Sequence, residues 1–142
     1  ASFFGSIQIF KYLKNNDVNL TPSLWFYSIH SNNSELIQIL QDNLSLQDDF
    51  SFVKCFFESI KCHHNEVANY IQNNFLLKKK ESFDEKFIKN VLCFYNFYFL
   101  PDDLTDSSSF YYLCRYNYNS LVDIYIEMKK KEIEEFVNQI PN

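Results

Sequence analysis

Two cysteines and two histidines stand close together and are the first groups in the chain that could do chemistry. They are Cys55, Cys62, His63 and His64. Thiolate and imidazole are common zinc ligands, but structural zinc sites prefer ligand pairs separated by two to four residues, a spacing that this group lacks. Cys55 also belongs to an apolar stripe. We therefore expect no metal and no cofactor here.

Other catalytic patterns are missing from the sequence. It holds no Gly-rich phosphate loop, no Gly-x-Ser-x-Gly elbow and no His-Glu-x-x-His. A Cys-His nucleophile pair stays open only because both residue types are present. Cys93 and Cys114 have no metal or disulfide spacing, and four reduced thiols favour an intracellular, cytoplasmic protein. Paired acids at 48–49, 102–103 and 134–135 are expected to be solvated, so we expect no enzyme.

Charge and hydropathy limit the partners. The net charge is -5, and the two lysine runs at 78–80 and 129–131 are bordered by acids. A nucleic-acid partner is therefore not expected, because phosphate binding calls for a concentrated basic face. The alternative, binding through Tyr116, Tyr118 and the lysine runs, would predict steep salt dependence. The most apolar segment, 91–100, is far shorter than the roughly 20 residues of a membrane span.

The chain contains an internal repeat. The stretch from Ser28 to Asn43 recurs 31 positions later, from Ser59 to Asn74. Self-similarity at such a period is typical of stacked structural units. The chain's single glycine leaves the turns to asparagine, which tolerates a left-handed backbone well.

Each copy predicts a helix, a turn and a second helix. In the first copy Thr21 is the expected N-cap and Pro22 lies in the first helical turn. Apolar residues at i, i+1, i+4 and i+5 predict one buried face per helix. The faces of this copy are Leu24, Trp25, Ser28 and Ile29, then Leu36, Ile37 and Leu40 after the turn at 32–34.

The same pattern returns twice more. The second copy has Cys55, Phe56, Ser59 and Ile60, a turn at 63–65, then Val67, Ala68 and Ile71. The third has Ser109, Phe110, Leu113 and Cys114, a turn at 117–119, then Leu121, Val122 and Tyr125. Between them lies a divergent helix with the stripe Phe87, Ile88, Val91, Leu92 and Tyr95, followed by an irregular connection through 107–109.

A last amphipathic helix is predicted at 131–140. Its stripe is Ile133, Phe136, Val137 and Ile140, and Pro141 stops it. This helix either begins a following unit or continues the helix that starts near Ser120.

The units resemble ankyrin repeats. The residues that carry the resemblance are the run from Leu113 to Val122, the turn and helix from Gly5 to Leu13, and the hairpin tip Asp17-Val18-Asn19. The composition is similar to that of degenerate, Asn- and Phe-rich ankyrin-repeat proteins of protozoan parasites. Spacings of 27 and 31 positions depart from the family's usual 33.

The resemblance implies an all-α helical-repeat solenoid of stacked helix-turn-helix units. We expect a single ankyrin-like domain over 1–142, as a fragment of a longer chain. Its units fall at about 1–20, 21–44, 51–75, 82–100 (divergent) and 108–129, with the terminal helix at 131–140.

The family binds proteins through its first helices and loop tips, so the resemblance implies a non-catalytic interaction module. Aligned copies place a cationic or titratable column, flanked by aromatic columns, where an acidic partner segment could bind. These candidate partner-binding residues are Phe26, Tyr27, His30, Phe57, Lys61, Tyr111, Tyr112 and Arg115. The alternative is a structural spacer or capping segment with no partner of its own, whose column would be buried or salt-bridged.

Overall fold

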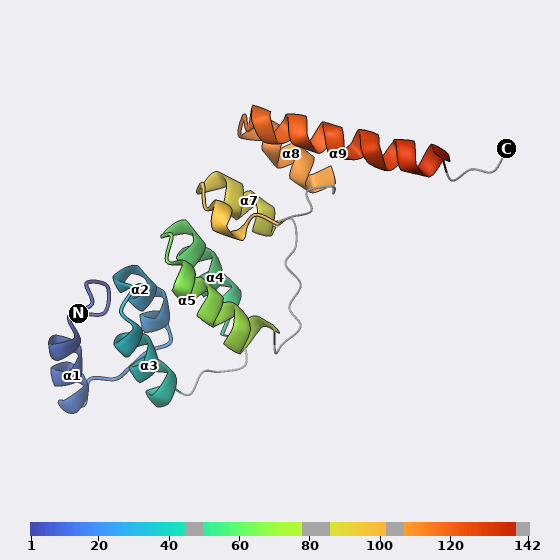
Figure 1. Cartoon of the computed structure of the whole chain (residues 1–142). Coiled ribbons are helices and arrows are strands. Elements are labelled where there is room, and N and C mark those ends of the chain that lie inside the picture. The colour runs from blue at the N-terminus through green and yellow to red at the C-terminus, as the bar shows by residue number, and fades with distance from the viewer. Residues whose placement is uncertain (45–49, 78–85, 102–106, 139–142) are drawn as a thin grey trace. The chain divides into compact units, whose positions relative to one another are not determined.

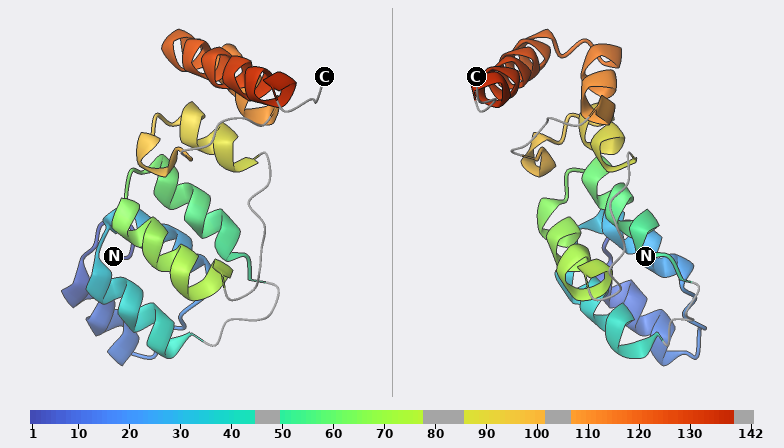
Figure 2. Two further views of the ribbon diagram at one scale, coloured as in Figure 1. Left: turned by 45° about the vertical axis from the view of Figure 1, so that its right-hand side comes forward. Right: turned by 90° about the vertical axis from the view of Figure 1, so that its right-hand side faces the viewer.

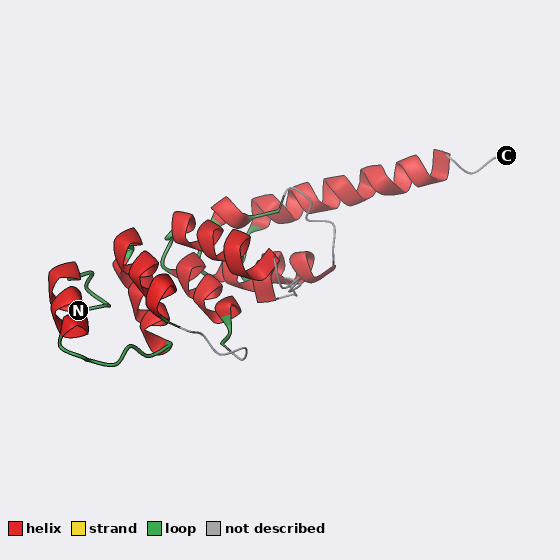
Figure 3. Cartoon of the chain, turned by 90° about the horizontal axis from the view of Figure 1, so that it is seen from below, coloured by secondary structure: helices red, strands yellow, loops and turns green. Residues whose placement is uncertain are grey.

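The computed structural model describes residues 1–44, 50–77, 86–101 and 107–138, and all regular elements in these ranges are helical (Figure 3). The all-α prediction is confirmed. The chain divides into two compact units, an N-terminal unit of residues 1–82 and a C-terminal unit of residues 83–142. Among the described helices, none is long and apolar enough to cross a membrane.

The N-terminal unit begins with α1, which is followed by the helix pairs α2–α3 and α4–α5 (Figure 1). Its elements are α1 (Ile7–Asn15), α2 (Ser23–Ser31), α3 (Ser34–Asn43), α4 (Phe52–Lys61), α5 (Asn65–Ile71) and the π-helical turn η1 (Gln72–Leu76). α2 packs against both α3 and α4, while α4 packs against α5 and η1. Two further views show the α2–α3 and α4–α5 pairs side by side (Figure 2). An ion pair between Lys11 and Glu35 joins α1 to α3.

The predicted buried faces of this unit are confirmed except at Leu24, which is half-buried. Trp25 and Phe56 are completely buried at equivalent positions of the two copies, and a completely buried isoleucine, Ile29 or Ile60, lies one helical turn after each. The second helices bury the predicted faces, which are Leu36, Ile37, Leu40, Val67, Ala68 and Ile71. Burial of this many large apolar side chains is the main stabilising contribution to such a small unit.

The repeated serines have one structural role. Ser28 Oγ donates to the carbonyl oxygen of Trp25 at 2.8 Å, and Ser59 Oγ donates to that of Phe56 at 2.7 Å. Both serines are completely buried. Each hydroxyl therefore satisfies its hydrogen-bonding need within its own helix and leaves a small surface on which the neighbouring helix can pack.

The turn after each first helix holds a residue in the left-handed conformation. These residues are Asn32 (φ 49°), His63 (φ 58°), Tyr95 (φ 58°) and Asn117 (φ 58°). After the last three, the next backbone N–H bonds back to a carbonyl five residues earlier, as in His64 N to Ser59 O at 3.0 Å, which is a Schellman end. Asparagine supplies two of these turns as predicted, whereas a histidine and a tyrosine supply the others.

The C-terminal unit contains α7 (Lys86–Cys93), the 3₁₀ turn η2 (Phe97–Phe99), α8 (Ser107–Arg115) and α9 (Asn119–Asn138). α7 packs against η2 and α8, and α8 packs against α9. Its core is Ile88, Leu92 and Leu113. Partly buried residues surround this core, and they are Phe87, Leu100, Tyr112, Tyr116, Tyr118, Leu121, Val122 and Tyr125.

Several sequence predictions for this unit were wrong. Tyr95 does not continue the α7 stripe, because the helix has ended and the residue is exposed at the left-handed turn. Residues 107–109 begin α8 instead of forming an irregular connection. Cys114 is exposed because it lies near the end of α8, away from the core side that Leu113 occupies.

The terminal helix is the continuation of the preceding one. α9 runs unbroken from Asn119 to Asn138, so the second of the two alternatives for this segment holds. Figure 1 shows α9 extending past the end of α8. Ile133 and Phe136 are exposed on this extension, while Ile140 and Pro141 lie outside the described residues. In the N-terminal unit, Thr21 does not cap α2 with its side chain, since its hydroxyl contacts Ser23 Oγ at 2.8 Å instead.

Candidate functional site

The predicted partner-binding residues lie on three helices. Phe26, Tyr27 and His30 are on α2, Phe57 and Lys61 are on α4, and Tyr111, Tyr112 and Arg115 are on α8. α2 packs against α4 in the N-terminal unit, and of the five residues on these helices His30 and Lys61 are linked across the contact through Glu58. The three residues of α8 belong to the C-terminal unit and form a separate group.

Two members of the predicted basic column share one carboxylate. Glu58 Oε1 lies 3.1 Å from His30 Nε2 and 3.2 Å from Lys61 Nζ. The Glu58 side chain is only 12% exposed, so its charge is poorly compensated by water. Sequence reasoning missed this role for Glu58, although its i,i+3 spacing to Lys61 was a signal for one of the two pairs.

Cys62 joins the same cluster from the C-cap of α4. Its Sγ lies 3.5 Å from His30 Nδ1, and one ligand atom from each of His30, Glu58 and Cys62 falls within 4.8 Å of the others. Burial, and then the negative charge of Glu58, raise the pKa of the Cys62 thiol, while Lys61 opposes them.

The two cysteines and two histidines that stand close together in the sequence do not form one cluster in the structure. Cys55 is buried, and burial followed by the Glu58 charge raises the pKa of its thiol to about 12. His64 Nδ1 lies 2.6 Å from the Ile29 carbonyl oxygen. His63 is exposed at the left-handed turn. Cys62 meets a potential ligand from another helix, His30.

An exposed aromatic surface adjoins the His30 cluster. We define it as Phe3, Phe26 and Tyr27, whose exposed fractions are 44%, 37% and 49%. The Phe3 ring stacks on the His30 ring with centroids 4.7 Å apart. The Phe26 ring makes edge-on contacts with two rings, His30 at 6.0 Å and Tyr27 at 6.5 Å between centroids. Phe3 was not among the predicted residues, because its contact with His30 is made across the fold.

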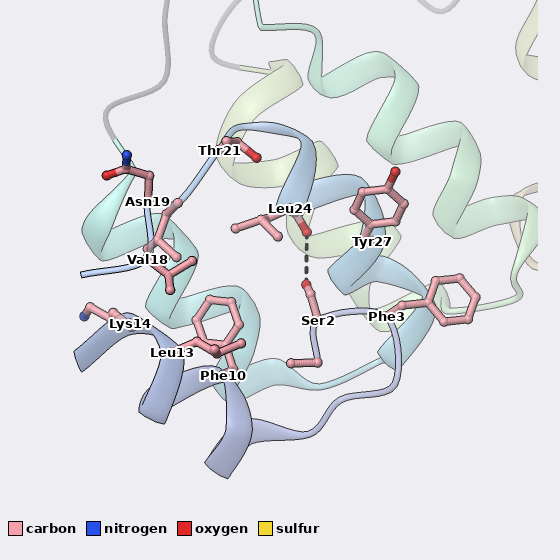
Figure 4. Close-up of a pocket in the computed structure, with 12 residues that line it drawn as sticks. Ser2, Phe3, Phe10, Leu13, Lys14, Val18, Asn19, Thr21, Leu24 and Tyr27 are labelled. Atoms are coloured by element: carbon pink, nitrogen blue, oxygen red, sulfur yellow. Dashed lines mark hydrogen bonds between the residues drawn. The ribbon is translucent and has the colours of Figure 1, made fainter. Parts of the chain in front are cut away.

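A pocket of about 300 Å³ opens beside this aromatic surface (Figure 4). Phe10, Leu13 and Val18 line it from α1 and the segment after it, while Leu24 and Tyr27 line it from α2. Ser2 Oγ donates to the Leu24 carbonyl oxygen at 3.4 Å, the dashed line of Figure 4. The N-terminal segment is thereby held against α2, with Phe3 at the pocket's edge.

The residues on α8 form their own cluster. Arg115 Nη1 donates to the Tyr111 hydroxyl at 2.7 Å, and its Cζ lies 5.9 Å from the Tyr111 ring centroid. Tyr112 stacks on Tyr116 at 6.3 Å and contacts Tyr111 edge-on at 5.0 Å. Arg115 and Tyr111 are exposed, whereas Tyr112 is half-buried against the core of this unit.

Comparisons with known proteins found no relative of this chain: no protein-family model, no curated protein and no solved structure matches it.

Proposed function

We propose that this chain is a non-catalytic protein-interaction module built as an ankyrin-like stack. Its binding face is the aromatic surface of Phe3, Phe26 and Tyr27 with the adjoining pocket. The observation that carries the proposal is the exposure of three large aromatic side chains beside an apolar pocket. Aromatic residues next to a pocket are the commonest anchors of protein interfaces.

Contacts between successive helix pairs support the stacked arrangement. At three left-handed turns, the side chain of the next residue reaches back to the preceding part of the chain: Asn33 Nδ2 donates to the Gly5 carbonyl oxygen at 3.3 Å, and the Tyr118 hydroxyl donates to that of Leu92 at 2.6 Å. His64 Nδ1 likewise contacts the Ile29 carbonyl oxygen. Because a carbonyl oxygen can only accept a hydrogen bond, Nδ1 of His64 carries the proton in this contact. One position thus serves the same purpose in three turns, as a repeat architecture requires.

The charge pattern favours an apolar partner segment over an acidic one. Glu58 lies between His30 and Lys61, and its carboxylate offsets the charge of Lys61. The face around α2 therefore presents rings and a pocket more than a basic strip. We propose a protein partner that inserts an apolar or aromatic side chain into the pocket, and the net charge of -5 disfavours nucleic acid.

The thiols support a binding role. A nucleophilic cysteine needs a lowered pKa, yet burial raises the pKa of both Cys55 and Cys62. The four cysteines are free, which is in keeping with a reducing compartment, and we propose the cytoplasm.

A photo-crosslinking experiment tests the proposal. A photoreactive phenylalanine analogue replaces Tyr27 in one variant of the full chain and Tyr98, an exposed tyrosine of the C-terminal unit, in the control variant. We expect a discrete protein adduct from position 27 that disappears when Phe26→Ala is added. Adducts of equal yield from both positions, or none from position 27, would contradict the proposal.

The ion pairs of Glu58 favour a second candidate, a structural spacer or capping segment in a longer repeat protein. In that role the basic column would serve only to join α2 to α4, as the contact between His30 and Glu58 does, while Lys61 pairs with Glu58 within α4. A spacer predicts that Phe26→Ala and Tyr27→Ala leave every interaction of the full-length protein unchanged, while Glu58→Gln lowers its thermal stability.

A further inference from the structure

The cluster at the α2–α4 contact combines three types of metal ligand. His30 comes from α2, while Glu58 lies on α4 and Cys62 follows one helical turn later at the C-cap of that helix. Residues at i and i+4 share one face of a helix, so both groups reach the imidazole, the thiol at Nδ1 and the carboxylate at Nε2. Helix packing alone brings the third ligand to them, over a separation of 32 residues along the chain.

The distances suit a tetrahedral ion. Zinc binds sulfur at about 2.3 Å and imidazole nitrogen at about 2.0–2.1 Å, so tetrahedral angles place these two ligand atoms about 3.5 Å apart. Cys62 Sγ and His30 Nδ1 are 3.5 Å apart. The Glu58 carboxylate contacts the other ring nitrogen, Nε2, at 3.1 Å. Its side chain must therefore rotate toward Nδ1 to complete a ligand set whose atoms lie within 4.8 Å of one another.

Partial burial adds to the fit. The side chains of His30 and Glu58 are 23% and 12% exposed, and Phe3 covers the imidazole ring by stacking on it. Low solvent access strengthens the attraction between a dication and the two anionic ligands that it would meet. The three side chains would fill three positions of a tetrahedral zinc ion, and water would fill the fourth.

We propose that His30, Glu58 and Cys62 form a binding site for Zn²⁺, with the thiolate and one imidazole nitrogen as ligands and the Glu58 carboxylate as the third. Zinc binding releases the proton of the thiol to water and displaces Lys61 from Glu58. The bound ion would hold α2 against α4. The zinc site does not depend on partner binding at the aromatic surface.

The alternative use of this cluster, a Cys-His-Glu nucleophile, has the wrong electrostatics. A nucleophilic thiol requires neighbours that favour the thiolate. Burial and the Glu58 charge both disfavour it at Cys62 and raise its pKa. A dication reverses both effects, because it neutralises Glu58 and bonds the thiolate directly.

Cobalt titration of the full-length chain under reducing conditions tests the site. Co²⁺ replaces Zn²⁺ and gives a thiolate-to-metal charge-transfer band when a cysteine binds it. We expect one equivalent of Co²⁺ to produce this band, zinc to abolish it by displacement, and Cys62→Ser to eliminate it. His30→Gln and Glu58→Gln should each weaken zinc binding, measured by competition with a chromophoric chelator, by more than about tenfold.

Three further variants sharpen the test. Lys61→Gln should strengthen zinc binding several-fold, because it removes the cation that competes for Glu58. His63→Asn removes an adjacent imidazole while keeping a residue that tolerates φ 58°, and Cys114→Ser removes an exposed thiol of the other unit. Both controls should bind zinc like the original protein.

A measurement on the unaltered protein guards against variants that fail to fold. Zinc should slow alkylation of Cys62 more than tenfold relative to Cys114, as read by peptide mass spectrometry, and a chelator should reverse the effect. No charge-transfer band, a band that survives Cys62→Ser, equal losses from His63→Asn and His30→Gln, or alkylation of Cys62 that ignores zinc would each overturn the proposal.

Discussion

The two units share one type of turn but differ in the segment after it. In the N-terminal unit the turns at Asn32 and His63 each lead into a second helix whose apolar face is buried. In the C-terminal unit the turn at Tyr95 leads only into a short 3₁₀ segment. The turn at Asn117 leads into α9, whose inward residues are half-buried. The backbone turn therefore forms even where a short 3₁₀ segment follows it in place of a second helix, because its hydrogen bonds are local.

The largest difference between the two units is expected when a leucine of the second helix is shortened to alanine. Leu40→Ala in α3 should lower the free energy of unfolding by about 2–5 kcal/mol, because Leu40 is completely buried and its removal leaves a cavity. Leu121→Ala in α9 should cost less than half as much, since Leu121 is only partly buried. Urea denaturation monitored by circular dichroism measures both, and equal losses would mean that the two second helices are packed alike.

The buried thiol should make alkaline stability depend on Cys55. Between the ordinary thiol pKa and the folded value of about 12, the unfolded chain has released the proton that the folded chain retains. The free energy of unfolding should therefore fall as pH rises above about 9, by up to about 1.4 kcal/mol per pH unit from this group.

The comparison that isolates this effect is the original protein against Cys55→Ala. Cys114→Ala in the C-terminal unit serves as the control, because Cys114 is exposed. Denaturant melts from pH 8 to 10.5 should show a shallower decline only in Cys55→Ala. Identical slopes in all three proteins would show that Cys55 titrates normally.

Substitution in the turns should affect the units equally. Asn32→Ala and Asn117→Ala should each cost about 1 kcal/mol, because alanine tolerates a left-handed backbone less well than asparagine. Asn32→Gly and Asn117→Gly should restore most of the stability. A thermal-melt series with a cost at Asn32 alone would show that the shared turn matters only where both helices are packed.

The smallest effect is expected from the exposed cations. Lys61→Ala should change the free energy of unfolding by no more than about 0.5 kcal/mol, since Lys61 is half exposed and its ion pair with Glu58 is screened by water. Arg115→Ala, on the exposed face of α8, should leave the melting temperature unchanged. A large loss of unfolding free energy in Lys61→Ala would instead show that the ion pair between Lys61 and Glu58 stabilises the fold.

Much of the local structure was predictable from the sequence. The repeat located the turns, and the period of 3.6 residues identified the buried faces around Trp25 and Phe56 because those faces are set within one helix. Helix ends were less predictable: Tyr95 has the apolar character of the α7 stripe, yet the left-handed turn takes it out of the helix. α9 continues through residues where the sequence pattern was equally compatible with the start of a new helix.

The candidate site was only partly predictable. Phe26, Tyr27, His30 and Lys61 emerge from aligning the copies, but the proximity of His30 to Cys62 arises from packing between α2 and α4. Pairs of positions on different helices have no periodic signal in a single sequence. The stacking of Phe3 on His30 likewise depends on how the N-terminal segment lies against α2.

The most direct test of the proposed binding face is the affinity of the partner captured by crosslinking at position 27. Calorimetry should compare the original protein with Phe26→Ala/Tyr27→Ala and with the control Tyr98→Ala. We predict that the double variant loses about tenfold or more in affinity with an unchanged melting temperature, while the control binds normally. Full affinity in the double variant would contradict the assignment of this face.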